Sequence, residues 1–138
     1  MTKIVINKRY GGFGLSPKAT IEYFKRKGID VYRYTQTIEE IHKEIFHKCD
    51  LSEHAYCDHY STIDKPTITS KEINDNYISE RDIERDDPDL ITIVEEMGET
   101  SFGDCATLEV IEIPDNVEWE ISEYDGWETI HEKHRVWE

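Results

Sequence analysis

The sequence has no run of about 18 consecutive apolar residues, the length that a membrane-spanning helix needs. Its opening, MTKIVINKRY, lacks the apolar segment and cleavage site of a secretory signal. Cysteine is scarce, because only Cys49, Cys57 and Cys105 occur, and their odd number and spacing do not fit a disulfide scaffold. We therefore expect free thiols, a cytoplasmic location and no membrane partner.

Recognisable catalytic motifs are missing as well. The sequence contains no G-x-S-x-G, no H-E-x-x-H and no kinase or lactamase signature. Carboxylates are so abundant that a close pair of them is inevitable and carries no information about glycosidase chemistry. We predict no catalytic residues and no cofactor, and an enzyme acting on a nucleotide is the least favoured of the functions considered.

Basic residues are unevenly distributed, and none occurs between Arg85 and Lys133. Residues 1–71 carry 12 Lys+Arg and 9 Asp+Glu, whereas residues 72–138 carry 4 and 22, within a net charge of −15. A surface of this sign repels phosphate, so direct nucleic-acid binding is not expected. The acidic half is either a solvated surface that aids solubility or a face that mimics nucleic acid and docks on a basic partner.

The first third of the chain has the pattern strand, helix, strand. A chain of 138 residues is the usual size of a single domain, so we expect residues 1–138 to form one domain. Residues 3–7 form a β-branched apolar run, Ser16 and Pro17 begin a helix of about 11 residues, and Gly28 ends it. Residues 29–34 alternate as a second strand. This order predicts a parallel βαβ unit.

The rest of the chain predicts further helices and a C-terminal hairpin. Thr37 and Glu40 form a capping box before a helix at about 38–48, and residues 50–81 read as an irregular connection or insertion. A later helix begins at Asp87-Pro88, and strands at 108–114 and 117–122 lead to a turn at 123–126. Trp119 and Trp127 could stack across that hairpin, as core or as a base-stacking platform. The predicted class is α/β or α+β, with a small mixed sheet and two to three helices.

The loop at residues 10–16, here called the glycine loop, is the strongest candidate binding site. Three glycines between a strand and a helix N-terminus allow backbone amides to converge on an anion. The spacing is neither the dinucleotide fingerprint nor a P-loop, so a plain tight turn remains the alternative. The candidate ligand-binding residues, which add nearby cations and aromatic rings, are Lys8, Arg9, Tyr10, Gly11, Gly12, Phe13, Gly14, Ser16 and Arg85.

Two weaker candidates lie further along the chain. His54, Cys57 and His59 could supply three zinc ligands, but their intervals match no zinc-binding spacing, so no metal is predicted. Arg85 stands next to a row of carboxylates. Arg81 and Arg85 either pair with Asp82, Asp86 or Asp87 or clamp a ligand.

Two stretches of the sequence resemble a widespread family of small accessory proteins of tailed bacteriophages. They are the opening IVINKRYGGFGLS, which a helix follows, and the closing RDDPDLITIVEEMGE with LEVIEIPDNVEWEISEYDGWETIHEKHRVW; the quoted letters are 58 residues. The resemblance implies a phage protein outside the virion that acts in the infected cell. Such proteins often counter host defences, and some trap nucleotide-derived immune signals.

Two functions follow as hypotheses. The first is a counter-defence protein that sequesters a cyclic nucleotide or ADP-ribose-type signal without turning it over, through the glycine loop and Arg85. The alternative is an acidic inhibitor that covers a basic, nucleic-acid-binding surface of a host defence protein or other host enzyme. A homodimer or higher homo-oligomer is compatible with either function.

Overall fold

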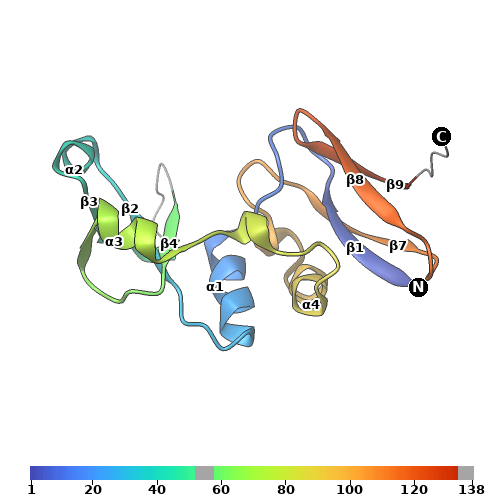
Figure 1. Cartoon of the computed structure of the whole chain (residues 1–138), viewed down its shortest axis with the longest axis horizontal. Coiled ribbons are helices and arrows are strands. Elements are labelled where there is room, and N and C mark those ends of the chain that lie inside the picture. The colour runs from blue at the N-terminus through green and yellow to red at the C-terminus, as the bar shows by residue number, and fades with distance from the viewer. Residues whose placement is uncertain (52–57, 134–138) are drawn as a thin grey trace, which may run out of the picture. The chain divides into compact units, whose positions relative to one another are not determined.

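The computed structural model describes residues 1–51 and 58–133. The chain divides into two compact units (Figure 1). Unit 1 comprises Met1–Ala19 and Ile83–Glu138, and unit 2 comprises Thr20–Asp82. The helix α1 (Pro17–Arg26) spans the point where the chain passes from one unit to the other. No helix in the described ranges is long and apolar enough to cross a membrane.

Unit 1 is built around two long antiparallel strands. β1 (Thr2–Asn7) pairs with β7 (Leu108–Ile113) along its whole length, from Thr2 opposite Ile113 to Asn7 opposite Leu108. Ile4, Val5 and Ile6 are all buried, although successive side chains of a strand point to opposite faces. Both faces of β1 must therefore be covered.

One cover is the helix α4 (Pro88–Met97), which contacts β1 and β7. Asp87 begins it by accepting a hydrogen bond from the amide of Asp89 at 2.8 Å, and Pro88 occupies the first turn, as the sequence predicts. Its buried residues, Leu90, Ile93 and Val94, recur at helical spacing and form one face.

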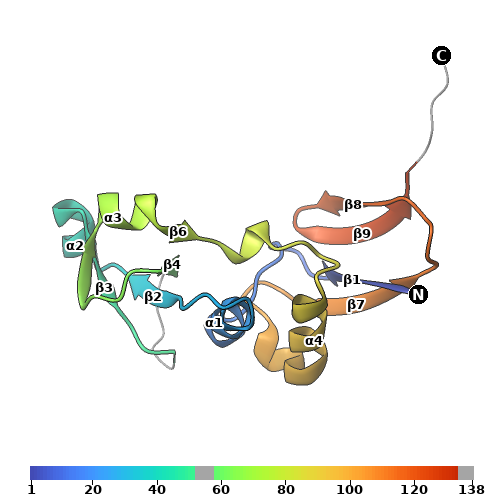
Figure 2. The ribbon, with the colours of Figure 1, turned by 60° about the horizontal axis from the view of Figure 1, so that its bottom comes forward.

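The other cover is the C-terminal hairpin of β8 (Trp119–Tyr124) and β9 (Trp127–Glu132), and β9 contacts β1. Figure 2 shows the hairpin and α4 on opposite sides of the β1–β7 ladder. The predicted turn is confirmed, because Asp125 (φ 49°) and Gly126 (φ 88°) join the strands as a two-residue loop with positive φ at both positions. The register places Tyr124 opposite Trp127 and Trp119 opposite Glu132, so the expected stacking of Trp119 on Trp127 is wrong.

Unit 2 contains a five-stranded sheet in which all pairs are antiparallel, in the order β5-β3-β2-β4-β6. Its strands are β2 (Tyr32–Thr35), β3 (Ile45–Lys48), β4 (His59–Ser61), β5 (Thr67–Thr69) and β6 (Tyr77–Ile78). Its short helices are α2 (Ile38–Lys43), α3 (Ser70–Asp75) and the 3₁₀ turn η1 (Glu80–Asp82); a second 3₁₀ turn, η2 (Gly98–Ser101), follows α4 in unit 1. The core of unit 2 consists of Tyr34, Phe46, Ile68 and Ile73.

The fold class is α/β with a C-terminal hairpin, as the sequence predicts, and the described residues contain four α-helices rather than two or three. The strand–helix–strand order at the start is confirmed, but its parallel pairing is wrong. β1 pairs with β7 and β2 pairs with β3 and β4, all antiparallel. Local sequence gives the order of elements, whereas the partner of β1 lies about a hundred residues away.

Two boundaries in unit 2 also differ from expectation. The helix expected at 38–48 ends at Lys43, because Glu44 adopts a left-handed conformation (φ 56°) and the chain continues as β3. Residues 50–81, expected to be irregular, contain β4, β5, α3 and β6 in their described part. These strands have two or three residues each, too few for the alternation that reveals a strand in a sequence.

Candidate functional site

The glycine loop follows β1 and precedes α1, where the sequence places it. Two of its amides donate hydrogen bonds within the protein: that of Gly11 to the carbonyl of Asp125 at 2.8 Å, and that of Ser16 to the carbonyl of Ser101 at 2.9 Å. The Ser16 hydroxyl donates to the Thr100 carbonyl at 2.6 Å and accepts from the Ala19 amide at 3.2 Å. Both ends of the loop are thus bound to neighbouring chain segments.

The glycines of the loop allow the hairpin turn to approach it closely. A Cβ atom on Gly126 would lie 2.1 Å from the amide nitrogen of Gly12, a separation that no side chain can occupy. Gly11 and Gly12 themselves have φ values of 122° and 108°, which favour glycine. The glycine spacing that suggested an anion cradle therefore also has a structural cause, which is main-chain packing between the loop and the β8–β9 turn.

Arg85 lies beside the loop and is held by a carboxylate. Its guanidinium is 3.6 Å from the centre of the Phe13 ring, and it binds both carboxylate oxygens of Glu128, at 2.6 and 2.9 Å. The side chains of Arg85 and Glu128 are 18% and 5% exposed. The structure brings Arg85 and Phe13 together, as the sequence suggests, but the charge of Arg85 is matched by Glu128 rather than by Asp86 or Asp87.

Asn7 completes this buried network, and sequence reasoning overlooked it together with Glu128. The backbone amide of Asn7 donates to Glu128 Oε1 at 2.8 Å. The side-chain Nδ2 of Asn7 donates to the carbonyls of Arg9 (2.7 Å) and Gly126 (2.8 Å). Its side-chain oxygen accepts from the amide of Thr107 at 2.9 Å. One available signal was Asn7 itself, a polar residue that ends an apolar strand three positions before the loop begins at Tyr10.

The two predicted cations before the loop lie near the surface. Lys8 Nζ is 3.8 Å from a carboxylate oxygen of Glu109, with 40% of the Lys8 side chain exposed. Arg9 is exposed and donates a long hydrogen bond of 3.5 Å to the carbonyl of Asp104. Neither is among the residues that line the hollow described next.

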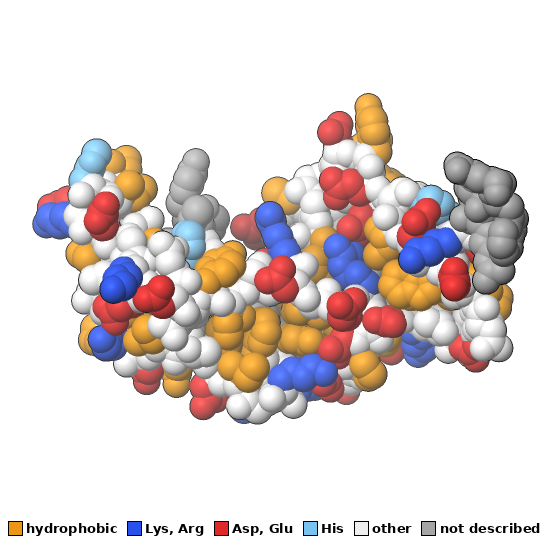
Figure 3. All heavy atoms as spheres, in the orientation of Figure 1, with side chains coloured by type: hydrophobic (Ala, Val, Ile, Leu, Met, Phe, Trp, Pro, Cys, Tyr) orange, Lys and Arg blue, Asp and Glu red, His pale blue; other side chains and the backbone are white. Residues whose placement is uncertain are grey.

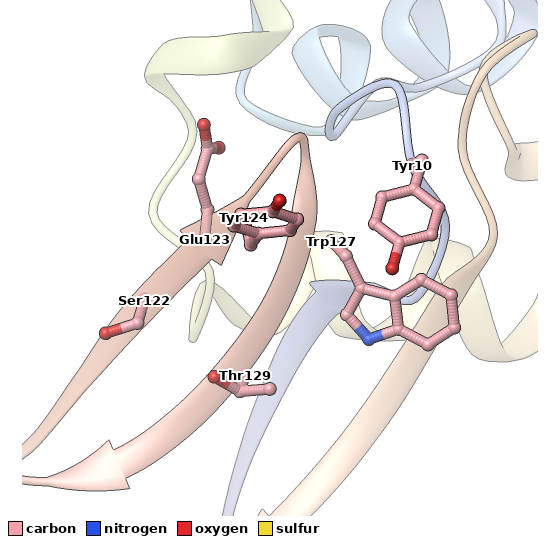
Figure 4. A pocket seen from close by; sticks show the side chains of 6 residues that line it. All are labelled: Tyr10, Ser122, Glu123, Tyr124, Trp127 and Thr129. Atoms are coloured by element: carbon pink, nitrogen blue, oxygen red, sulfur yellow. The ribbon is translucent and has the colours of Figure 1, made fainter.

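An open hollow of about 270 Å³ lies where the glycine loop meets the hairpin (Figure 4). Its aromatic members are exposed, Tyr10 at 60%, Tyr124 at 72% and Trp127 at 39%. The Tyr10 ring centre lies 5.2 Å from that of Trp127 and 6.5 Å from that of Tyr124. This aromatic hollow is lined by Tyr10, Ser122, Glu123, Tyr124, Trp127 and Thr129.

Of these six residues, only Tyr10 was among the sequence-predicted ligand-binding residues. Tyr124 and Trp127 flank the Asp125–Gly126 turn, and a two-residue turn places the residues on either side of it opposite one another. The proximity of Tyr124 and Trp127 could therefore be predicted from the turn sequence. The position of Tyr10 next to them could not be predicted, because it depends on the contact between the glycine loop and the turn.

The segment from β7 to β9 carries a series of carboxylates, one of which, Glu123, lines the hollow, and we call them the acidic surface. They are all exposed, and they comprise Glu109, Glu112, Asp115, Glu118, Glu120, Glu123, Asp125 and Glu132. Two of them meet cations of the same unit, since Asp115 lies 3.1 Å from the N-terminal amine and Glu109 lies near Lys8. Figure 3 shows one face of the molecule, on which carboxylates and hydrophobic side chains lie next to one another.

The zinc candidates can be examined only in part, because His54 and Cys57 lie outside the described residues. His59 lies in β4 with its ring centre 4.9 Å from that of Phe46, and burial lowers its pKa. Among the residues that are described, no group of three or more His, Cys, Asp or Glu side chains is arranged to hold a metal ion. Cys49 and Cys105 are free thiols.

No family model, curated protein or solved structure matches this chain.

Proposed function

We propose that the protein is a non-catalytic inhibitor whose acidic surface covers a basic, nucleic-acid-binding surface of another protein. The observation that carries this proposal is that unit 1 presents both eight exposed carboxylates on the segment from β7 to β9 and an exposed aromatic hollow, of which Tyr124 and Trp127 belong to the same segment. By the resemblance of the chain's two ends to phage proteins, we further propose that the partner is an enzyme of the infected cell.

Charge supports the proposal first. No Lys or Arg occurs in the sequence from residue 86 to residue 132, so this part of unit 1 presents carboxylates with few local counter-charges. Close carboxylates of like sign repel one another, and a cationic partner relieves that repulsion on binding. Complementary charge also accelerates association and rejects partners of the same sign.

The aromatic hollow can contribute affinity that the exposed charges alone do not. Rim ion pairs contribute little affinity, whereas tyrosine and tryptophan are enriched at the residues that dominate binding energy. Tyr10, Tyr124 and Trp127 are exposed in unit 1, and Tyr124 lies between Glu123 and Asp125 in the chain. An aromatic centre within a charged rim is the usual anatomy of a protein-binding surface.

Three versions of the protein test the proposal by capture from bacterial lysate. They are the wild type, an acidic-surface variant with Glu112, Glu118, Glu120 and Glu123 changed to Gln, and a control variant with Asp30→Asn, Glu39→Gln, Asp75→Asn and Asp82→Asn. All eight side chains are exposed, and the control makes the same change of net charge on unit 2.

We expect the wild type and the control variant to capture the same basic protein, which salt and duplex DNA should release. The acidic-surface variant should not capture it. Equal capture by all three, or a partner that DNA does not displace, would contradict the proposal.

A second candidate is sequestration of a nucleotide-derived signal, and the aromatic hollow is the observation in its favour. A base could stack on Tyr10 or Trp127, with Lys8 and Arg9 nearby in the chain. The use of two loop amides and of Arg85 inside the protein weighs against it. Cyclic dinucleotides, cyclic ADP-ribose isomers and NAD should each be tested for an increase in melting temperature. An increase with any of them would favour this candidate over the inhibitor, and its absence up to millimolar ligand would exclude it.

A further inference from the structure

The aromatic hollow has the composition of a cation-binding cage. Three ring systems contribute to it, with interplanar angles of 75° between Tyr10 and Tyr124 and 53° between Tyr10 and Trp127. The rings therefore present faces in different directions instead of forming one flat stack. Figure 4 shows Tyr10 and Trp127 adjacent to one another and Tyr124 beside them, with Ser122 and Thr129 further along the strands.

Backbone contacts fix the positions of the three aromatic residues of the hollow. Tyr124 and Trp127 are a directly paired cross-strand couple, and the two-residue turn between them fixes their separation. The Gly11 amide, next to Tyr10, donates to the carbonyl of Asp125 in that turn at 2.8 Å. The loop and the hairpin are thus joined next to the rings, so that a ligand meets rings whose backbone is already in position.

The surrounding charge selects a cation rather than an anion or a neutral group. Aromatic ring faces are electronegative and attract cations within about 6 Å. Among the described residues that line the hollow there is no Lys or Arg, whereas Glu123 lines it and Asp125 lies in the adjoining turn, next to Tyr124. Although the Glu123 side chain points away from the rings in Figure 4, its negative charge remains close to the site. A phosphate here would be repelled.

Among cations, a guanidinium fits best. It is planar, it stacks on aromatic faces, and it is more weakly hydrated than an ammonium. The same unit already contains this interaction, since the Arg85 guanidinium lies 3.6 Å from the Phe13 ring centre. The hydroxyls of Ser122 and Thr129 and the phenol oxygens of Tyr10 and Tyr124 offer acceptors for its N–H groups.

We propose that the aromatic hollow is a recognition site for a single arginine side chain of the basic partner. This inference rests on the proposed function and makes it more specific. The acidic surface brings a basic partner close, and the hollow binds one of its arginines. It implies that the partner's arginine cannot be replaced by lysine without loss of affinity.

The test uses the whole chain, labelled with ¹⁵N, and three seven-residue peptides that differ only at the central position, which is arginine, citrulline or lysine. The indole N–H signal of Trp127, assigned with Trp127→Phe, reports binding at the hollow directly. We expect the arginine peptide to shift this signal and to bind roughly three- to tenfold more tightly than the citrulline peptide, which has the same shape without the charge. The lysine peptide should fall between them.

Variants locate the effect. Tyr124→Leu should reduce arginine-peptide binding by a similar factor, and because Tyr124 is 72% exposed its replacement should leave the fold intact. Tyr77→Leu is the matched control, since Tyr77 is 56% exposed, lies in β6 of unit 2 and is not part of the hollow. Tyr77→Leu should bind like the wild type.

Four results would overturn the inference: equal binding of arginine and citrulline peptides, tighter binding of adenosine monophosphate at Trp127, an unchanged affinity in Tyr124→Leu, or a Trp127 signal that changes on dilution because a second copy fills the hollow. A failure of this inference can be distinguished from a failure of the proposed function. If the arginine peptide does not bind but salt-sensitive capture of a basic protein persists and is unaffected by Tyr124→Leu, the cage is wrong and the inhibitor stands.

Discussion

At the scale of single residues, the best-defined contact in unit 1 is the close approach of Gly126 to the glycine loop. It joins the two segments that carry Tyr10 on one side and Tyr124 and Trp127 on the other. Because the hydrogen of glycine is replaced by a methyl group in alanine, this contact can be removed by a single substitution.

Gly126→Ala is therefore expected to destabilise the protein more than Gly28→Ala. Both glycines have a positive φ, 88° and 80°, so each alanine pays a backbone cost of about 1–2 kcal/mol. Only at Gly126 would the new Cβ meet other atoms, at 2.1 Å from the Gly12 nitrogen, whereas nothing lies within 4 Å at Gly28. Urea unfolding measures both changes, and equal losses would show that the loop and the turn are not in contact.

The buried pair of Arg85 and Glu128 leads to a second prediction. Glu128→Gln leaves the guanidinium without its counter-charge in a site where the Arg85 side chain is only 18% exposed. We expect a loss of about 3 kcal/mol or more in the free energy of unfolding. The double variant Arg85→Met, Glu128→Gln removes both charges, keeps an acceptor for the Asn7 backbone amide, and should lose less than Glu128→Gln does. A double variant that is the less stable of the two would mean that the pair itself is strongly stabilising.

At the scale of secondary-structure elements, local signals located the starts of α1, α2 and α4 but missed α3, and they located strand partners poorly. Pro17 and Asp87-Pro88 correctly begin α1 and α4, and Asp125-Gly126 correctly marks the hairpin turn. These signals depend on neighbouring residues. The pairing of β1 with β7 depends on residues far apart in the chain, which no local pattern can specify.

The same limit applies to the candidate site. The sequence drew attention to the glycine loop and to Arg85, and the structure places both in unit 1. The sequence could not reveal that Glu128 binds Arg85, 43 positions away, nor that Tyr10 lies next to Trp127. Both arrangements follow from the packing of the hairpin on β1, which is a tertiary interaction.

The helix α2 gives a prediction about pH. Burial acts to raise the pKa of Glu40, but hydrogen bonds from the Thr37 amide and from His47 outweigh it and hold the pKa below its ordinary value. A carboxyl group whose pKa is lowered by folding stabilises the protein above its unfolded-state pKa, about 4.3, and this stabilisation is lost as the pH falls through the folded-state value.

Glu40→Gln should accordingly reduce stability near neutral pH and flatten its dependence on pH in the acid range. Chemical unfolding between about pH 3 and pH 7 provides the measurement. Glu39→Gln is the control, because the Glu39 side chain is 78% exposed and its partner among the described residues is Lys43. If Glu39→Gln flattens the curve as much as Glu40→Gln does, the capping box does not cause the effect.

At the scale of the whole molecule, charge is the dominant property. A net charge of −15 on 138 residues opposes the compact state through self-repulsion, and added salt screens that repulsion. We expect the melting temperature to rise between about 20 mM and 300 mM sodium chloride. The acidic-surface variant should have a higher melting temperature than the wild type at low salt, and its melting temperature should rise less as salt is added. An unchanged or falling melting temperature would mean that the carboxylates are compensated in the folded protein.

The central claim is that the acidic surface, together with the aromatic hollow, binds a basic partner. The most direct measurement is the affinity of an arginine-rich 16-residue peptide for wild type, acidic-surface variant and control variant, by calorimetry across a range of salt concentrations. We predict that affinity falls steeply with salt for wild type and control, and that the acidic-surface variant binds at least about tenfold more weakly with a shallower dependence on salt. Identical affinities for the acidic-surface and control variants would contradict the account, because binding would then depend on net charge alone.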